Sequence, residues 1–183
     1  GFMAKWTNAL WSEPIRHAIH WYVEANLCAG GVEGALVLAQ AALELLGWLY
    51  LVEDPATSRA SMKQFDQRWK AQDRIRCLLG ALQVPTGIPA ALQELHAAAA
   101  SLKALDGPAV YVELRNGIVH PKHSRRASLR QTPDEARRQA WQLGLWYIEM
   151  ILLRLFGYDG VYYDRFERSW PGVRKLVPWV TSA

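Results

Sequence analysis

The sequence contains little cysteine: its 183 residues include only Cys28 and Cys77. Neither belongs to a Cys-x-x-Cys pair, which argues against a zinc site and against a thioredoxin-type redox motif. Both fall within helical patterns, so we expect two buried free thiols, as are usual in a reducing cytoplasm. The chain also lacks the charged and then apolar opening of a signal peptide. These absences favour a cytoplasmic protein.

Several catalytic patterns are absent as well. The acidic residues are dispersed, with no arrangement that indicates a two-metal nuclease. The sequence has no Gly-rich phosphate loop, no G-x-S-x-G elbow and no Cys/His nucleophile pattern. His17 and His20 lie three residues apart without an evident third ligand, so we expect surface or core positions for them rather than metal binding. We predict that the protein uses neither a metal ion nor another cofactor.

What the chain has in abundance is apolar, helix-forming sequence. Apolar residues make up 51% of it, Ala and Leu dominate its middle, and β-branched runs are short. Its length suits one domain with a sizeable core. We therefore expect residues 1–183 to form a single all-α domain. Gly1 and Phe2 ahead of Met3 resemble a cloning remnant, and the chain is either complete or a fragment of a longer protein.

Capping residues and helix breakers predict a bundle of four to six helices with an irregular aromatic tail. The expected helices span about 12–28, 32–52, 58–82, 89–105, 109–119 and 132–156. Thr132 is expected to cap the last of them. The second is long and apolar, yet Glu33, Gln40 and Glu44 interrupt it, and a charge at the membrane centre costs roughly 2.5–3.5 kcal/mol. We expect this helix at the centre of the bundle, with no membrane, and the tail at 158–183 as turns and short helical pieces.

The segment Arg115-Asn116-Gly117-Ile118-Val119-His120 carries the clearest chemical signal. Asn116 and His120 are four residues apart and share a helix face. Arg115 lies about 100° round the helix from Asn116, and its long side chain reaches the same patch. The helix is expected to end at His120 because a residue before proline avoids the α conformation. An arginine, an amide and an imidazole thus converge at one helix end.

These three side chains fit the cleavage of RNA without a metal ion. An imidazole titrates near neutrality, so that of His120 can take or give the proton of a ribose 2′-OH. Arg115 can bind two phosphate oxygens as charge builds on them, and Asn116 can bind the phosphate or orient the imidazole. The expected products are a 2′,3′-cyclic phosphate and a 5′-hydroxyl. The reaction needs both an acid and a base, so we expect a homodimer with facing motifs, with His123 as the in-chain alternative.

A basic stretch follows this motif, although the formal net charge is only +4. No acidic residue occurs between Leu114 and Pro133. We expect a loop as far as Gln131 that attracts phosphates, and the equally open alternative is a solvated flexible loop. Its expected RNA- and phosphate-binding residues are Lys122, His123, Arg125, Arg126 and Arg130.

Arg115 and Asn116, followed by three residues and His120, resemble the Arg-Asn-x-x-x-His motif of the HEPN superfamily. The resemblance extends over about 31–179 and implies a helical bundle. It also implies a typically dimeric, metal-independent endoribonuclease of toxin–antitoxin, abortive-infection or phage-defence systems, with those three residues catalytic. An antitoxin or a sensor domain is then an expected partner. The tail segments that resemble the end of ApeA-like HEPN domains are Leu155-Phe156-Gly157-Tyr158, Tyr163-Asp164-Arg165 and Val177-Pro178-Trp179.

Alternatives from other classes stay open. Some HEPN members have lost catalysis, so one alternative is an inactive HEPN module that binds RNA, a nucleotide or a partner protein. Another is a structural helical domain whose exposed tail aromatics mediate assembly. The motif residues also have ordinary structural roles open to them, since His120 can bond free carbonyls at a helix end and Arg115 can pair with Glu113.

Overall fold

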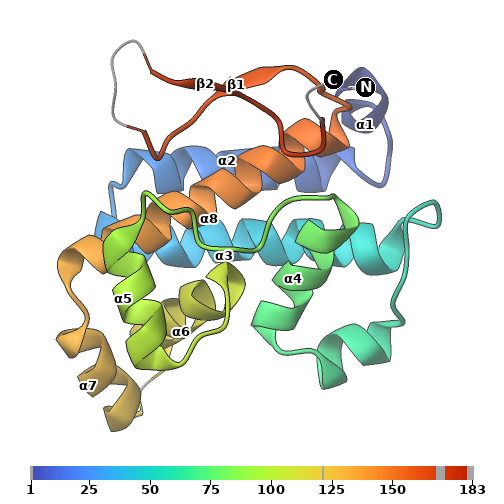
Figure 1. Cartoon of the computed structure of the whole chain (residues 1–183). Helices are drawn as coiled ribbons and strands as arrows, with labels where there is room; N and C mark the ends of the chain where they lie inside the picture. Colours follow the sequence, from blue (N-terminus) through green and yellow to red (C-terminus); the bar gives the residue numbers. More distant parts are fainter. Residues whose placement is uncertain (1, 121, 168–171, 181–183) are drawn as a thin grey trace.

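The computed structural model describes residues 2–120, 122–167 and 172–180, and most of its regular structure is helical (Figure 1). This confirms the predicted all-α fold. The α-helices are α1 (Phe2–Trp6), α2 (Ser12–Leu27), α3 (Gly31–Trp48), α4 (Ala71–Ala81), α5 (Gln93–Leu102), α6 (Gly107–Val119), α7 (His123–Gln131) and α8 (Asp134–Leu155). The other elements are the π-helical turns η1 (Leu49–Glu53) and η2 (Gln64–Arg68), and the strands β1 (Val161–Tyr163) and β2 (Arg174–Leu176).

Helix α3 lies at the centre of the fold and contacts α2, α4, α6 and α8 (Figure 1). Its Leu36, Leu43 and Leu46 are fully buried, and burial of each such side chain contributes about 1.5–3 kcal/mol. Together, α3 and η1 are long and apolar enough to cross a membrane, but 56% of their most apolar window is buried inside the fold. The predicted position of this helix at the centre of the bundle is confirmed.

The prediction of one continuous helix over 58–82 is wrong, because helical structure runs over 62–68, is interrupted at 69–70 and resumes in α4. The turn η2 ends at Arg68, the next two residues are extended, and α4 begins at Ala71. A local cap explains the interruption, because the Lys70 N–H donates to the Asp73 carboxylate over 3.2 Å. A carboxylate at the third helical position that reaches back to the cap is a helix start.

The basic loop predicted before Gln131 is also wrong, since helix α7 occupies it. Its sequence has three Arg together with Ala, Leu and Gln, and no glycine or proline, which favours a helix. Gly117 of α6 lets α7 approach closely, because a Cβ there would lie 3.1 Å from the Cβ of Leu129. Thr132 does not cap α8; its hydroxyl donates to the Ser128 carbonyl over 3.0 Å and closes the end of α7.

The tail forms a hairpin rather than the turns and short helical pieces that we expected. Strands β1 and β2 are antiparallel, with Val161 opposite Leu176. The Val-Tyr-Tyr sequence of β1 has the β-branched and aromatic residues that favour strands. The hairpin lies beside α2 and α8, on the opposite side of the molecule from α7 (Figure 1).

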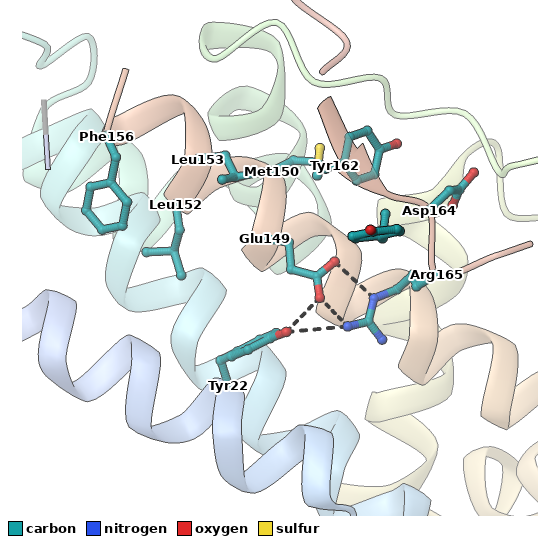
Figure 2. Close-up of a pocket in the computed structure, with 10 residues that line it drawn as sticks. Tyr22, Glu149, Met150, Leu152, Leu153, Phe156, Tyr162, Asp164 and Arg165 are labelled. Carbon is teal, nitrogen blue, oxygen red and sulfur yellow. Dashed lines mark hydrogen bonds and ion pairs between the residues drawn. The ribbon is translucent and has the colours of Figure 1, made fainter. Parts of the chain in front are cut away.

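Figure 2 shows how the tail is fixed to the bundle. Arg165 forms an ion pair with Glu149 of α8, and the Tyr22 hydroxyl of α2 donates to the same carboxylate over 2.7 Å. Burial, together with the negative charge of Glu149, raises the pKa of Tyr22 to about 12. These side chains border a cavity of about 470 Å³ whose other lining residues are mostly apolar, including Leu152 and Phe156. The network joins the tail to two helices.

The two cysteines are free thiols, as expected, but both are half-buried rather than buried. Cys28 ends α2 in the left-handed conformation, with φ of 53°. Burial raises the pKa of the Cys77 thiol, which keeps it protonated and unreactive near neutral pH.

Candidate functional site

Helix α6 carries the predicted motif, and local interactions fix both of its ends. The Asp106 carboxylate accepts a hydrogen bond from the Ala109 N–H over 3.0 Å and caps the start. The helix ends directly before His120, which is extended and donates its N–H to the Asn116 carbonyl over 3.1 Å. This confirms the end predicted for a helix ahead of a proline.

Most of α6 is buried against the core, and the motif lies at its more exposed C-terminal end. Tyr111 is fully buried, and its hydroxyl donates to the Leu36 carbonyl of α3 over 2.8 Å. Gly144 of α8 permits close contact, since a Cβ there would lie 2.6 Å from the Tyr111 ring. One turn after this anchor Arg115 is half-buried, and His120 at the helix end is exposed.

The three motif side chains line one cleft of about 760 Å³. Its walls are the C-terminal half of α6, the start of α4 and the connection between α5 and α6. Arg115 Nη1 donates to Asn116 Oδ1 over 3.4 Å, while the buried Nε of Arg115 has no hydrogen-bond partner among the described residues. The volume is in the range of small-ligand sites, roughly 300–1,000 Å³. An open cleft therefore lies beside the exposed imidazole of His120.

The cleft is rich in cations that no acidic group of the described residues neutralises. Arg76 is held by Asp73 and Asp106 over 2.6 and 2.7 Å, and Glu113 is the one acidic residue in the lining. The start of α4 adds the positive end of its helix dipole. Such a surface attracts a polyanion. The lining cations that form no ion pair within the described part of the chain are Lys70, Arg74, Lys103, Arg115 and Arg125.

The predicted phosphate-binding residues are only partly brought to this cleft. Arg125 lines it, whereas Lys122, His123 and Arg130 are exposed on or beside α7 and do not line it. The side chain of Arg126 lies outside the described residues. A helix distributes its side chains around its axis, so a basic sequence in α7 does not place all of its charges on one side.

The lining residues that were not predicted from the sequence include Trp69, Lys70, Arg74 and Lys103. The first two reach the cleft because the chain is interrupted between η2 and α4, where we expected a continuous helix. The acidic residue three positions after Lys70 is a local signal for that interruption. Lys103 ends α5 in the left-handed conformation, and nothing in its neighbourhood in the sequence indicates that it meets α6.

The groups of the cleft suit proton transfer and the binding of phosphate. They comprise an imidazole, an amide, guanidinium groups and ammonium groups. Such groups move protons and stabilise charge that develops on phosphate oxygens. Across residues 2–120, 122–167 and 172–180, no three His, Cys, Asp or Glu side chains are placed to hold a metal ion. His17 and His20 are exposed on α2, away from the cleft lining.

The fold and the cleft together define an all-α domain with a basic cleft at the end of a helix that carries an Arg-Asn-x-x-x-His segment. The chain belongs to the family described as the YopA C-terminal domain, whose model matches residues 8–175. It is similar to the SPbeta prophage-derived uncharacterized protein YopA of Bacillus subtilis (strain 168), with 29% identity over 178 residues. The match covers 97% of this chain but 38% of that relative, so the chain spans less than two fifths of the relative's length. No solved structure matches the chain.

Proposed function

We propose that this domain is a metal-independent endoribonuclease. The observation that carries the proposal is the exposed imidazole of His120 in one cleft with the side chains of Arg115 and Asn116. The cations around them that have no acidic partner among the described residues supply attraction for an RNA backbone. The resemblance of this segment to the HEPN motif supports the same reaction.

In the proposed reaction, the ribose 2′-oxygen attacks the adjacent phosphorus and the 5′-oxygen leaves. His120 takes the 2′-OH proton or gives a proton to the leaving oxygen. Arg115 binds the phosphate oxygens as negative charge builds on them, and Asn116 orients the imidazole or the phosphate. The products are a 2′,3′-cyclic phosphate and a 5′-hydroxyl. An imidazole can deprotonate this internal nucleophile, so the reaction needs no metal-bound water.

The second proton-transfer group is proposed to come from a second copy of the domain. One cleft holds a single histidine among its lining residues, and His123, the in-chain alternative, does not line it. His120 is exposed at the end of α6, where a two-fold partner can approach it. A homodimer with facing clefts would then supply both an acid and a base.

We place this activity in the bacterial cytoplasm, in anti-phage defence or a toxin–antitoxin system. The prophage origin in the description of the Bacillus subtilis relative supports this setting, as does the HEPN resemblance. A nuclease that acts on cellular RNA needs a restraint. Because the chain corresponds to 38% of that relative, the longer protein has room for a sensor domain, and a separate antitoxin is the other source of control.

The test is cleavage of labelled single-stranded RNA in the presence of EDTA. The wild type should cut, and His120→Ala should lose at least about 10²-fold in rate, the lower limit for a positioned acid or base. His20→Ala is the matched control, because His20 is also exposed but lies on α2 outside the cleft. Cutting that EDTA abolishes, or that His120→Ala leaves intact, would overturn the proposal.

The cation-rich cleft also favours a second function, that of a non-catalytic module that binds RNA or a nucleotide. The unpaired charges of Lys70, Lys103 and Arg125 serve binding whether or not the RNA is cut. This alternative predicts RNA binding without cleavage, unchanged by His120→Ala. The same variants therefore separate the two functions.

A further inference from the structure

Trp69 gives the cleft a feature that the proposed cleavage step does not use. It is half-buried and lines the cleft together with the motif residues. Its indole N–H has no hydrogen-bond partner within the described ranges of the chain. Tryptophans elsewhere in the fold do bond this group: Trp11 donates to Asp54 over 2.8 Å and Trp141 donates to the Ala25 carbonyl over 2.9 Å. Trp69 therefore keeps its polar edge unused at a cleft wall.

Trp69 is held both through its ring and through its backbone. The ring centroid lies 6.1 Å from that of Phe65 at an interplanar angle of 54°, and Phe65 is only 2% exposed. Phe65 is itself held edge-on by Trp48, with centroids 5.3 Å apart. On the backbone side, Arg74 Nε donates to the Trp69 carbonyl over 3.3 Å. The ring contact and the backbone bond hold Trp69 at the cleft wall, so an aromatic side chain is in place there before any ligand arrives.

The neighbours of this ring indicate the chemistry of its ligand. Lys70 follows it directly, and Lys103 and Arg115 line the same cleft without an acidic partner in the described residues. An aromatic side chain among cations that have no acidic partner in the described residues fits a ligand that carries both a flat π-system and phosphates. Nucleotides in a single strand have both, and their bases are free to stack because no second strand covers them.

We propose that Trp69 is the platform on which a nucleobase next to the scissile phosphate stacks, while the surrounding cations hold the backbone. This inference rests on the proposed function in that RNA is taken as the ligand of the cleft. Stacking would position the strand so that one phosphodiester lies at His120 and Arg115. Trp69 is therefore assigned a positioning role and takes no part in proton transfer.

The test measures binding of a short fluorescent 2′-O-methyl oligonucleotide, which lacks the free 2′-OH and cannot be cut by the proposed reaction. Trp69→Leu keeps an apolar side chain but removes the π-surface, whereas Trp69→Phe keeps an aromatic ring. Trp69→Leu should bind about 5- to 150-fold more weakly, the range that corresponds to stacking of one base. Trp69→Phe should recover most of the affinity. Unfolding curves for both variants check that the fold is retained.

A second series uses oligonucleotides with one abasic position, which distinguishes stacking from a general effect on the fold. In the wild type, loss of the base at one position should weaken binding about as much as Trp69→Leu does. In Trp69→Leu the same abasic change should cost nothing further, because its partner is already gone. The proposed stacking role of Trp69 would be overturned if the abasic change weakened binding by the same factor in Trp69→Leu as in the wild type. It would also be overturned if Trp69→Leu bound with wild-type affinity. Binding that shows this coupling while RNA stays uncut would instead contradict only the proposed ribonuclease.

Discussion

The guanidinium of Arg115 lies beside the side chain of Asn116, with Nη1 donating to Oδ1 over 3.4 Å. This distance exceeds the 2.7–3.2 Å that is usual for an N–H to oxygen bond, so the interaction is weak. The Nε of the same guanidinium is buried and finds no partner in the described structure. The hydrogen-bond donors of Arg115 thus have few partners among the described residues. The side chain gives up only one weak hydrogen bond when it turns from Asn116 to a phosphate.

Arg115→Lys tests whether the planar shape of this group matters as well as its charge. Lysine keeps the positive charge but cannot bind two phosphate oxygens in parallel. We expect the single-turnover cleavage rate to fall by about 10²-fold or more, as when one stabilising donor of a transition state is removed. RNA affinity should change much less. Arg59→Lys, an exposed change outside the cleft, is the control, and an unaltered rate in Arg115→Lys would exclude the proposed role.

The salt dependence of RNA binding tests the cleft as a phosphate-binding surface. For a single strand, the slope of log K against log salt is about −0.7 for each phosphate contact. Lys103→Ala should reduce the magnitude of the slope by about 0.7, because Lys103 lines the cleft and has no acidic partner among the described residues. Arg59→Ala should leave the slope unchanged. Equal slopes for Lys103→Ala and the wild type would show that RNA does not lie along this wall.

The sequence predicts the helical architecture and the motif helix well because these depend on local signals. The cap at Asp106 and the proline after His120 are both visible in the sequence. In the structure α6 begins directly after Asp106 and ends directly before His120. The burial of α3 in the bundle is likewise indicated by the spacing of its apolar residues, although the helix is long enough to cross a membrane.

Tertiary contacts and competing local signals explain what the sequence did not predict. The cleft wall that contains Trp69 and Lys70 comes from the interruption after η2, where a cap by Asp73 outweighs the helical pattern on either side. Lys103 lines the cleft because the chain turns there, between α5 and α6. Helix α7 lies where the many basic and polar residues led us to predict a loop. The prediction was wrong because helix propensity depends on each residue type and not on charge alone. The motif could therefore be identified from the sequence, but the cleft around it could not.

Gly144→Ala should destabilise the fold at the contact that holds α6. The new Cβ would lie 2.6 Å from the Tyr111 ring, which cannot retreat because it is fully buried and its hydroxyl is bonded to Leu36. We expect the free energy of unfolding in urea to fall by about 1–3 kcal/mol. Gly80→Ala is the matched control: nothing lies near its Cβ in α4, so it should stabilise by up to about 1 kcal/mol. An unchanged stability in Gly144→Ala would contradict the close packing described.

The raised pKa of Tyr22 predicts that the fold loses stability at alkaline pH. Burial and the Glu149 carboxylate raise its folded-state pKa to about 12 from an ordinary value of 10.0. The folded state therefore holds the proton of the Tyr22 hydroxyl more tightly than the unfolded chain does. The resulting contribution to the free energy of unfolding is complete below pH 10 and is lost as the pH rises towards 12.

The measurement is the free energy of unfolding in urea at several pH values on both sides of 10. The wild type should lose stability above that pH, and Tyr22→Phe should show a shallower decline. Part of the decline should persist in the variant, because burial also raises the pKa of Tyr111, Tyr147 and Tyr162. A decline equally steep in both proteins would mean that the hydroxyl of Tyr22 is not held as Figure 2 shows.

Whether the domain cleaves RNA through the 2′-OH without a metal ion can be decided with a DNA strand that contains a single ribonucleotide, incubated with the protein in EDTA. The proposed reaction requires the 2′-OH, so the strand should be cut only on the 3′ side of that ribonucleotide. It should leave a 2′,3′-cyclic phosphate and a 5′-hydroxyl, and His120→Ala should leave the strand intact. Cutting of an all-deoxy strand, or products that end in a 3′-hydroxyl, would contradict a nuclease that uses the imidazole of His120 and the hydroxyl of its own substrate.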